Sequence, residues 1–570
     1  MFLFIYVGLF SSLIYAFDLH RASPEKYIGK STTIKMNIGH EYMAVTSDPQ
    51  ATKAAYDILS DGGTAADAAI AAQLVLGLTE PQSSGLGGGA FILYFDALNN
   101  ILTTFDGRET APLASMPNYF LKKNMEPMNF FEAVLNGRSV GVPGTPALLG
   151  KLHERFGKTN MQKLIEPAFN LALNGFSPSK GLLKSLKNDV GRLDQNIISK
   201  EYFYNKQIIK NNKYASVLKN FADKGSSIFY KSPLSTNIIN SVNKKNGILI
   251  QKDFDSYSVI ERKPVCDIFQ KYKVCSMGEP SSGALTMLQI LKLIDHDPTW
   301  HNYIEASKLA FSDRNYYMAD PDFVKTPGEL LLENDYIVKR RSMISDNNIM
   351  INVKHGIPFG WKEINQTEYS GLNESGTTHI SIIDKYGNAI SMTSTIENSF
   401  GSRIMANGYL LNNELTDFSF TPEKNNSLIA NRVEAGKRPR SSMTPTIVFS
   451  TLTDKPVLII GSAGGSRIIG YVTQRIIDVL YNNISLEDAI NAPHILNRGG
   501  NIEAEEETKI TNSLIQKGHL LDITPLASGL TAIHLDIDKN IIKGVSDPRR
   551  IGTALGLSLI HISEPTRLGM

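Results

Sequence analysis

The sequence predicts a layered fold that combines helices with sheets, of the α/β or α+β class. Residues 115–350 are mostly helical in pattern, with amphipathic runs such as "MQKLIEPAFNLALNGF" and "ALTMLQILKLIDH". From residue 377 onward the pattern changes to short strand-like runs, among them "THISIID", "AISMTST" and "PVLIIGS". Helical and strand regions in one chain are typical of architectures in which helices cover sheets.

Composition and charge exclude some partners. The chain has 570 residues, of which 42% are hydrophobic and 20% are charged, as in ordinary globular proteins. The formal net charge is only +2, and the lysines are scattered rather than gathered in a basic stripe with interleaved aromatics. We therefore expect no nucleic-acid partner.

The N-terminal residues 1–16, "MFLFIYVGLFSSLIYA", are almost wholly apolar, and charge begins at Asp18. This run is short for a membrane span, which needs about 20 apolar residues, and it predicts a signal peptide. It lacks a Lys or Arg after Met1, so an uncleaved anchor or a buried strand is the alternative. We expect the mature protein to be periplasmic or secreted.

The chain has two cysteines, Cys266 and Cys275, in "KPVCDIFQKYKVCSM". Two strand-like runs flank a polar turn there, so the pair could face each other across a hairpin and form a disulfide in an oxidising compartment. Two cysteines alone cannot build a structural zinc site, and we expect no metal and no cofactor.

The first helices and strands are predicted between residues 48 and 107. "DPQATKAAYDILSDGG" has apolar residues at helical spacing and a Gly-Gly stop, and "TAADAAIAAQLVLGLTEP" predicts a second helix that is buried nearly all round. Two strands, at 90–95 and 101–105, are predicted around an Asn-Asn turn.

The run "GLGGGA", which begins at Gly85, fits the dinucleotide fingerprint on paper. That fingerprint must follow a strand and open a helix, whereas here a helix precedes the glycines and a strand follows them. We therefore interpret the glycines as a site of close backbone packing or as one wall of a small-molecule site.

The most informative stretch is "GTTHISIIDKYGNAISMTST", which begins at Gly376 and predicts a β-hairpin with its turn at "DKYGN". If the turn is centred between Tyr386 and Gly387, Thr377 and Thr395 become cross-strand neighbours with Cβ atoms about 5 Å apart. A Thr hydroxyl is a poor nucleophile without a base, but a Thr at a chain N-terminus can use its own amine. Cleavage between Gly376 and Thr377 would create that terminus. Taken alone, an ordinary pair of strand threonines is the better interpretation.

The pair is not alone. "TSTIENSFGSRIM", "LLNNELTDFS", "GKRPRSSMTPTIV" and "GSAGGSRI" follow it in order, and "FDGRETAP", "GVPGTP", "PSSGA" and "FSDRNYYMADPDF" precede it. With these motifs the chain resembles the γ-glutamyltranspeptidases, members of the N-terminal nucleophile hydrolase superfamily, from about residue 40 to Gly556. The resemblance implies an α+β fold with four layers in the order αββα. It also implies a precursor that cleaves itself into a large subunit, 17–376, and a small subunit, 377–570, which stay associated as a heterodimer in one intertwined domain.

The resemblance also implies roles for individual residues. Thr377 would be the nucleophile, Thr395 would hydrogen-bond its amine, and Gly464 and Gly465 would form the oxyanion hole. The donor would be glutathione or another γ-glutamyl compound, and an amino acid or dipeptide would be the acceptor. The other implied contacts are with the two ends of the donor: Arg108, Ser441 and Ser442 for its carboxylate, and Glu397, Glu414 and Asp417 for its ammonium.

Three features depart from the family pattern. Glu397 stands where many members have Asn. The connection from Asp417 to Ser441 is shorter than in members with a lid loop and has no Tyr or Trp, so we expect an open site that accepts bulky donors. The end of the chain, 557–570, has no recognisable counterpart and resembles a translated sequencing adapter.

Two other functions stay open at this stage. A related amidase could act on poly-γ-glutamate or glutaryl-cephalosporin, although glutaryl lacks the ammonium that the three acids would hold. An exported binding or structural protein with an inactive site is the non-enzymatic alternative.

Overall fold

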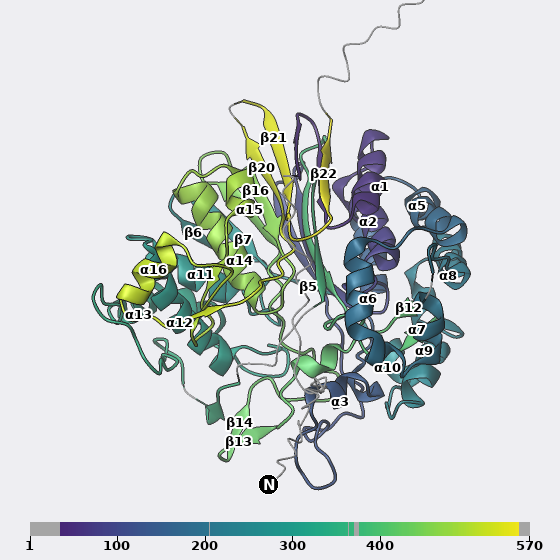
Figure 1. Ribbon diagram of the computed structural model, residues 1–570, viewed down its shortest axis with the longest axis horizontal. Helices are drawn as coiled ribbons and strands as arrows, with labels where there is room; N and C mark the ends of the chain where they lie inside the picture. Colours follow the sequence, from purple (N-terminus) through teal and green to yellow (C-terminus); the bar gives the residue numbers. More distant parts are fainter. Residues whose placement is uncertain (1–34, 205, 363, 370–375, 538, 558–570) are drawn as a thin grey trace, which may run out of the picture.

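The computed structural model describes residues 35–204, 206–362, 364–369, 376–537 and 539–557. The predicted signal peptide and nearly all of the predicted non-native tail lie outside these residues. Within them, two seven-stranded antiparallel sheets lie face to face, and helices cover the outer face of each (Figure 1). This arrangement confirms the α+β class and the αββα order of layers.

The first sheet, which we call the β10 sheet, carries the predicted hairpin at its centre. Its strands are, in spatial order, β22 (Thr553–Gly556), β2 (Met43–Thr46), β9 (Thr377–Ile383), β10 (Ala389–Thr395), β3 (Gly89–Asp96), β4 (Ile101–Gly107) and β5 (Ile260–Arg262).

The second sheet, which we call the β16 sheet, packs against the first. Its strands are, in spatial order, β1 (Lys35–Gly39), β21 (Ile541–Ser546), β20 (Thr531–Asp536), β16 (Pro456–Gly461), β15 (Thr446–Ser450), β7 (Tyr272–Ser276) and β6 (Val265–Phe269). Both sheets interleave strands from before and after residue 376, so cutting the chain there would leave the two products interlocked.

Strand β3 shows why the sheets form two cores. Side chains alternate between the faces of a strand, so Phe91, Leu93 and Phe95 point to one side and Ile92 and Tyr94 to the other. The first three belong to the core between the sheets, where Phe95 meets Phe449 of β15 with ring centroids 5.1 Å apart. Ile92 and Tyr94 belong to the core beneath the covering helices. A strand buried on both faces is therefore apolar throughout.

Helices from the first half of the chain cover the β10 sheet (Figure 1). They are α1 (Pro49–Ser60), α2 (Ala65–Thr79), α4 (Thr145–Phe156), α5 (Met161–Asn174), α6 (Lys180–Leu193), α7 (Ile197–Phe203), α8 (Asn212–Lys224), α9 (Leu234–Asn243) and α10 (Gln251–Asp255). The predicted Ala-rich helix is α2, which packs on β9, β10 and α5 and is buried along nearly its whole length.

The β16 sheet is covered by helices from later segments. They are α11 (Gly283–Ile294), α12 (Trp300–Tyr317), α13 (Asn334–Arg341), α14 (Arg467–Ile476), α15 (Leu486–Asn491) and α16 (Lys509–Gln516), with the π-helical turn η5 (Ile477–Tyr481) extending α14. The long helix that ends shortly before Pro321 is α12.

Short elements complete the described chain. They are α3 (Phe130–Val134), the 3₁₀ turns η1 (Gly137–Ser139), η2 (Ser226–Tyr230), η3 (Gly328–Leu332) and η4 (Glu414–Asp417), and the strands β8 (Gln366–Thr367), β11 (Met405–Ala406), β12 (Tyr409–Leu410), β13 (Glu423–Lys424), β14 (Ser427–Ile429), β17 (Ile495–Leu496), β18 (Ile502–Ala504) and β19 (Leu521–Ile523).

The glycine run before β3 lies where backbones meet closely. A Cβ on Gly88 would collide with the carbonyl oxygen of Thr395, and one on Gly87 would collide with that of Leu410. Strand β3 follows the run directly, with no helix after it. The glycines therefore pack backbone against backbone, and the structure agrees with the rejection of a dinucleotide site.

Cys266 and Cys275 form a disulfide across the β6–β7 hairpin, where they are paired in register. Strand β6 is the edge strand of the β16 sheet.

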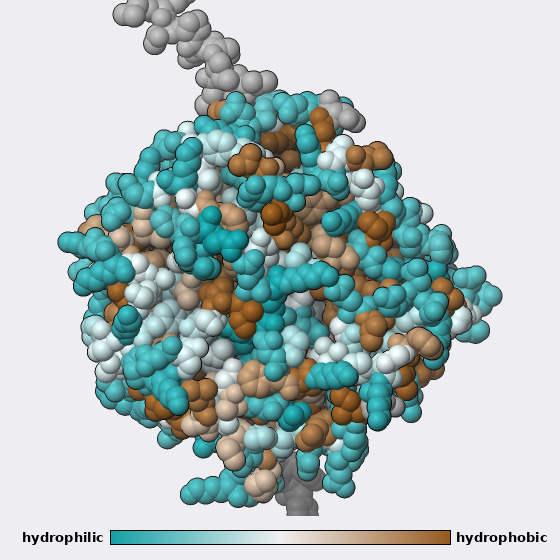
Figure 2. Space-filling model, turned by 180° about the vertical axis from the view of Figure 1, so that it is seen from behind, coloured by the Kyte–Doolittle hydropathy of each residue, from teal (hydrophilic) through white to brown (hydrophobic). Residues whose placement is uncertain are grey.

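Among the described residues, no helix combines the length and apolarity required to cross a membrane. Figure 2 shows one face of the molecule, where hydrophobic residues are dispersed among hydrophilic ones.

Candidate active site

The β9–β10 hairpin has the predicted register. Thr377 pairs with Thr395, and the two hydroxyl oxygens lie 3.4 Å apart. Thr395 is also opposite Gly89 of β3, so the pair lies at the end of three adjacent strands. Both threonines are almost completely buried. The alternation of the two strands and the turn residues were sufficient to predict this contact.

The peptide bond before Thr377 is held by Thr395. The Thr395 hydroxyl donates to the carbonyl oxygen of Gly376 at 2.7 Å and accepts from the backbone N–H of Glu397 at 2.9 Å. Gly376 has a φ of 117°, and a Cβ there would lie 2.6 Å from the carbonyl oxygen of Glu397. A side chain at 376 would disturb this contact, so the position requires glycine. A hydroxyl on this carbonyl polarises it toward attack by a neighbouring nucleophile.

Glu397 turns toward the same site although it lies beyond the end of β10. Its backbone has a φ of 72°, and its carboxylate accepts a hydrogen bond from the side-chain amide of Asn413. Asn413 also accepts from the backbone N–H of Asn398 at 2.9 Å. The turn is therefore held from both sides, with the Glu397 carboxylate buried.

Arg108 follows β4 and forms ion pairs with both predicted acids of η4. One guanidinium nitrogen binds Glu414, and the other binds Asp417 and also donates to the carbonyl of Arg440 at 3.0 Å. Burial alone would lower the pKa of Arg108, but the two carboxylates raise it above its ordinary value, so the group stays a cation. The family resemblance assigns Arg108 to the carboxylate of the donor and the two acids to its ammonium. In the structure these groups contact each other directly.

Ser441 and Ser442 lie next to this cluster in an extended segment. Ser441 forms a parallel bridge with Ser281, and its hydroxyl accepts from the backbone N–H of Met443 at 3.1 Å. The hydroxyl of Ser442 accepts from Arg314 at 2.6 Å. Arg314 belongs to α12, so this helix sets the orientation of a predicted binding group.

Gly464 and Gly465 connect β16 to α14. Their φ values are 128° and 59°, which favour glycine at both positions. A Cβ on Gly464 would lie 2.6 Å from the ring of Tyr471, so the loop packs directly on α14. The turn places Gly465 beside Thr377 in one pocket.

A small pocket gathers the predicted residues. Its lining consists of Arg108, Thr377, Thr395, Glu397, Glu414, Asp417, Ser441, Ser442, Met443, Gly465 and Ile468. Gly464, the remaining predicted site residue, directly precedes Gly465. Two carboxylates bound to one guanidinium, and a third from Glu397, give the pocket an acidic balance. It can therefore bind a cationic group of a ligand close to the Thr377 hydroxyl. Among the described residues no cluster of His, Cys, Asp and Glu suited to a metal ion was found.

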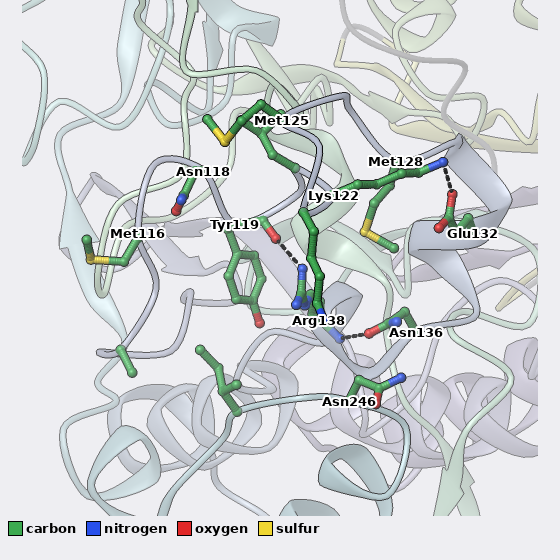
Figure 3. A pocket seen from close by; sticks show the side chains of 14 residues that line it. Met116, Asn118, Tyr119, Lys122, Met125, Met128, Glu132, Asn136, Arg138 and Asn246 are labelled. Carbon is green, nitrogen blue, oxygen red and sulfur yellow. Dashed lines mark hydrogen bonds and ion pairs between the residues drawn. The ribbon is translucent and has the colours of Figure 1, made fainter.

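A second, open cavity of about 670 Å³ lies beside α3 and contains none of the predicted site residues. Figure 3 shows its lining, in which Lys122 forms an ion pair with Glu132 at 3.0 Å and Arg138 donates to the carbonyl of Tyr119 at 3.1 Å. Lys122 and Arg138 therefore already have protein partners, and none of the predicted catalytic groups lies in this lining.

Comparisons with known proteins agree with this geometry. The family model for gamma-glutamyltranspeptidase matches residues 51–557. The chain belongs to this family. It is 33% identical to a glutathione hydrolase proenzyme of Bacillus subtilis strain 168, covering 92% of this chain and 93% of that one. A glutathione hydrolase proenzyme of Escherichia coli strain K12 is 32% identical, covering 89% and 90%.

A solved structure has the same fold. The cephalosporin acylase from Bacillus halodurans superposes with a TM-score of 0.79, covering 94% of this chain and 99% of that one at 23% identity. At this level of identity the likeness concerns the fold alone.

The family resemblance did not single out three residues that the structure places at the site. Asn413 and Arg314 lie inside the motifs "NNELTDFS" and "FSDRNYYMADPDF", and they orient Glu397 and Ser442. Glu109 follows Arg108 and is fully buried, which raises the pKa of its carboxyl to about 8. Asn413 and Glu109 adjoin predicted residues in the sequence, whereas the only signal for Arg314 is its place in a motif that carries the family resemblance.

The connection from Asp417 to Ser441 is structured. It forms the hairpin β13–β14, and β14 pairs in parallel with β8, which lies upstream of Gly376. This small sheet joins segments from the two sides of the predicted cleavage site.

Proposed function

We propose that this protein is a self-processing γ-glutamyl hydrolase and transferase that acts on glutathione and related donors. The relatives named glutathione hydrolase proenzyme support the activity. The observation that carries the proposal for this chain is the contact between the Thr395 hydroxyl and the Gly376 carbonyl, one residue before Thr377.

Self-cleavage would be the first reaction. The Thr377 hydroxyl attacks the Gly376 carbonyl carbon, and the C–N bond breaks as the Thr377 nitrogen takes up a proton. The product is an ester between Gly376 and the Thr377 oxygen. Water then hydrolyses this ester, which releases the Gly376 carboxylate and leaves Thr377 with a free amine and a free hydroxyl.

Turnover would use the new chain end. The Thr377 amine accepts the proton of its hydroxyl while the oxygen attacks the γ-amide carbonyl of the donor. The backbone N–H groups of Gly464 and Gly465 would stabilise the oxyanion, and the leaving amine takes the proton. The glutamyl ester then passes to water, or to the amine of an amino acid or dipeptide acceptor.

The donor's two charges would be recognised separately. Arg108 would bind the carboxylate by exchanging a contact with Glu414 or Asp417 for one with the donor, and Ser441 and Ser442 would add hydroxyl donors. Glu397, Glu414 and Asp417 would bind the ammonium. Because three carboxylates face one guanidinium, the pocket favours a donor that carries an ammonium group over glutaryl compounds, which lack one.

The maturation scheme is part of the proposal. Residues 1–16 would act as a signal peptide for a periplasmic or secreted protein. Residues 17–376 and 377–570 would form the large and small subunits, and 557–570 would be a non-native end. The interleaved strands of both sheets support the association of the two products.

One experiment tests reaction class and processing together. Purified protein should give two bands on a denaturing gel, with Thr377 at the new N-terminus, and Thr377→Ala should stay uncut. Incubation with glutathione and Gly-Gly should yield glutamate and γ-glutamyl-Gly-Gly. The similar fold of the cephalosporin acylase makes an acylase the alternative to test. The outcome that would favour it is a cleaved protein that releases glutaryl from glutaryl-cephalosporin but no glutamate from glutathione.

A further inference from the structure

The segment just upstream of the predicted cleavage site is anchored to the connection between Asp417 and Ser441. Strand β8 pairs with β14, with Gln366 opposite Leu428 and Thr367 opposite Ile429. The side chain of Gln366 donates to the carbonyl of Tyr316 at 3.0 Å. Two residues after β8 the chain reaches Tyr369.

Tyr369 contacts three parts of the molecule at once. Its backbone N–H donates to the carbonyl of Asn315 at 3.0 Å, and its hydroxyl donates to the carbonyl of Phe418 at 3.3 Å. Its own carbonyl accepts from the guanidinium of Arg440 at 2.9 Å. The same guanidinium lies 5.9 Å from the centroid of the Tyr369 ring.

These partners are direct neighbours of pocket residues. Phe418 follows Asp417, and Arg440 precedes Ser441. The carbonyl of Arg440 accepts from Arg108 at 3.0 Å, so a shift of Arg440 would also move a contact of that guanidinium. A side chain that fixes Phe418 and Arg440 relative to each other therefore fixes the two segments that surround the donor.

We propose that Tyr369 is a positioning residue for donor binding, and that it keeps this role after cleavage as part of the large subunit. This inference rests on the proposed function. The segment 418–440, which has no Tyr or Trp, would thus be braced by an aromatic from the other side of the cleavage site. Tyr369 acts through Asp417 and Ser441 and does not itself touch the reacting atoms.

The test is the kinetics of Tyr369→Ala in the full, processed protein with glutathione as donor. Loss of a cation–aromatic contact and a hydrogen bond should loosen the binding segments and raise KM about five- to tenfold. Thr377, Thr395 and the glycine loop are untouched, so kcat should stay within about twofold and the two bands should form normally.

Tyr386→Ala is a matched control. The hydroxyl of Tyr386 also donates to a carbonyl, that of Gly62 at 3.0 Å, and its ring lies 4.7 Å from the ammonium of Lys158. This tyrosine lies at the turn of the β9–β10 hairpin, at the opposite end of the strands from Thr377. Its removal should leave both KM and kcat unchanged.

A double-mutant cycle isolates the proposed path. In an Arg440→Ala background, Tyr369→Ala should raise KM by a smaller factor than in the wild type, because the cation–aromatic contact is already lost and the hydrogen bond to Phe418 remains to be removed. If Tyr369→Ala failed to mature, Tyr369→Leu would replace it, since leucine keeps an apolar side chain but loses the hydroxyl and the aromatic face.

Wild-type KM in the substituted protein, or an equal rise in Tyr386→Ala, would overturn the inference. Failure of the proposed function would look different: wild-type protein would be cleaved yet release no glutamate from glutathione.

Discussion

At the scale of single residues, the site depends on a few buried groups whose partners are all within the protein. Thr395 is the clearest case, because one hydroxyl both donates to the Gly376 carbonyl and accepts from Glu397. Its contribution to self-cleavage can be separated from its contribution to the fold, since valine has nearly the same shape without the hydroxyl.

We predict that Thr395→Val slows self-cleavage roughly a hundredfold, the effect typical of losing one donor to a developing oxyanion. The measurement is the rate at which purified precursor converts into two bands. Thr395→Ser keeps the hydroxyl and should mature at nearly the wild-type rate. Equal rates for the valine and serine variants would show that the hydrogen bond is not used.

Glu109 predicts a dependence of stability on pH. Burial raises the pKa of its carboxyl from the ordinary 4.5 to about 8, so between these values the folded state binds more protons than the unfolded state. Stability of the wild type therefore falls as pH rises through this window, and the loss is complete above the folded pKa.

Glu109→Gln should remove this loss. Its thermal midpoint should match that of the wild type near pH 4.5 and exceed it near pH 9. At pH 9 we expect its free energy of unfolding to be about 1–3 kcal/mol higher than that of the wild type. Thermal melts of both proteins at several pH values make the comparison. A constant difference at every pH would mean that Glu109 does not titrate in this range.

At the scale of elements, backbone contact between β3 and β10 positions Thr395. The glycine run that precedes β3 allows this approach, because Gly88 has no side chain to meet the Thr395 carbonyl. The sequence predicted close packing here but could not name the partner, which lies about three hundred residues away in the chain. Contacts between distant segments leave no periodic signal in either segment.

Gly88→Ala should destabilise the fold by about 1–3 kcal/mol, because the added methyl overpacks the interface of two strands. Gly191→Ala is the matched control, since the structure shows nothing within 4 Å of a Cβ at this position in α6. Alanine in a helix should be neutral or stabilise by up to about 1 kcal/mol. Denaturant unfolding of the two variants measures both effects.

At the scale of the whole molecule, the disulfide and the candidate active site lie in different parts of the fold. The disulfide between Cys266 and Cys275 lies at the edge of the β16 sheet, whereas the pocket lies at the ends of the central strands of the β10 sheet. A change at the sheet edge should therefore affect unfolding without reaching the pocket.

We predict that Cys266→Ser with Cys275→Ser lowers stability by about 2 kcal/mol, near the low end for a disulfide because the loop it closes is short. The kcat/KM for glutathione should not change. Treating the wild type with a reducing agent should reproduce the shift in thermal midpoint. A loss of activity in the mature double variant would connect the disulfide to the site.

The sequence by itself determined the class of fold and the register of the hairpin, and it predicted most of the residues that line the pocket. Alternation along two strands and a turn sequence define which residues are opposite each other, so the Thr377–Thr395 pair followed from local pattern. The order of the motifs along the chain indicated the family. Only the tertiary structure decided that Arg108 binds Glu414 and Asp417, that Arg314 holds Ser442, and that Tyr369 braces the segments beside the pocket. These contacts join segments that folding brings together from far apart in the chain, and their geometry depends on how the sheets and helices pack.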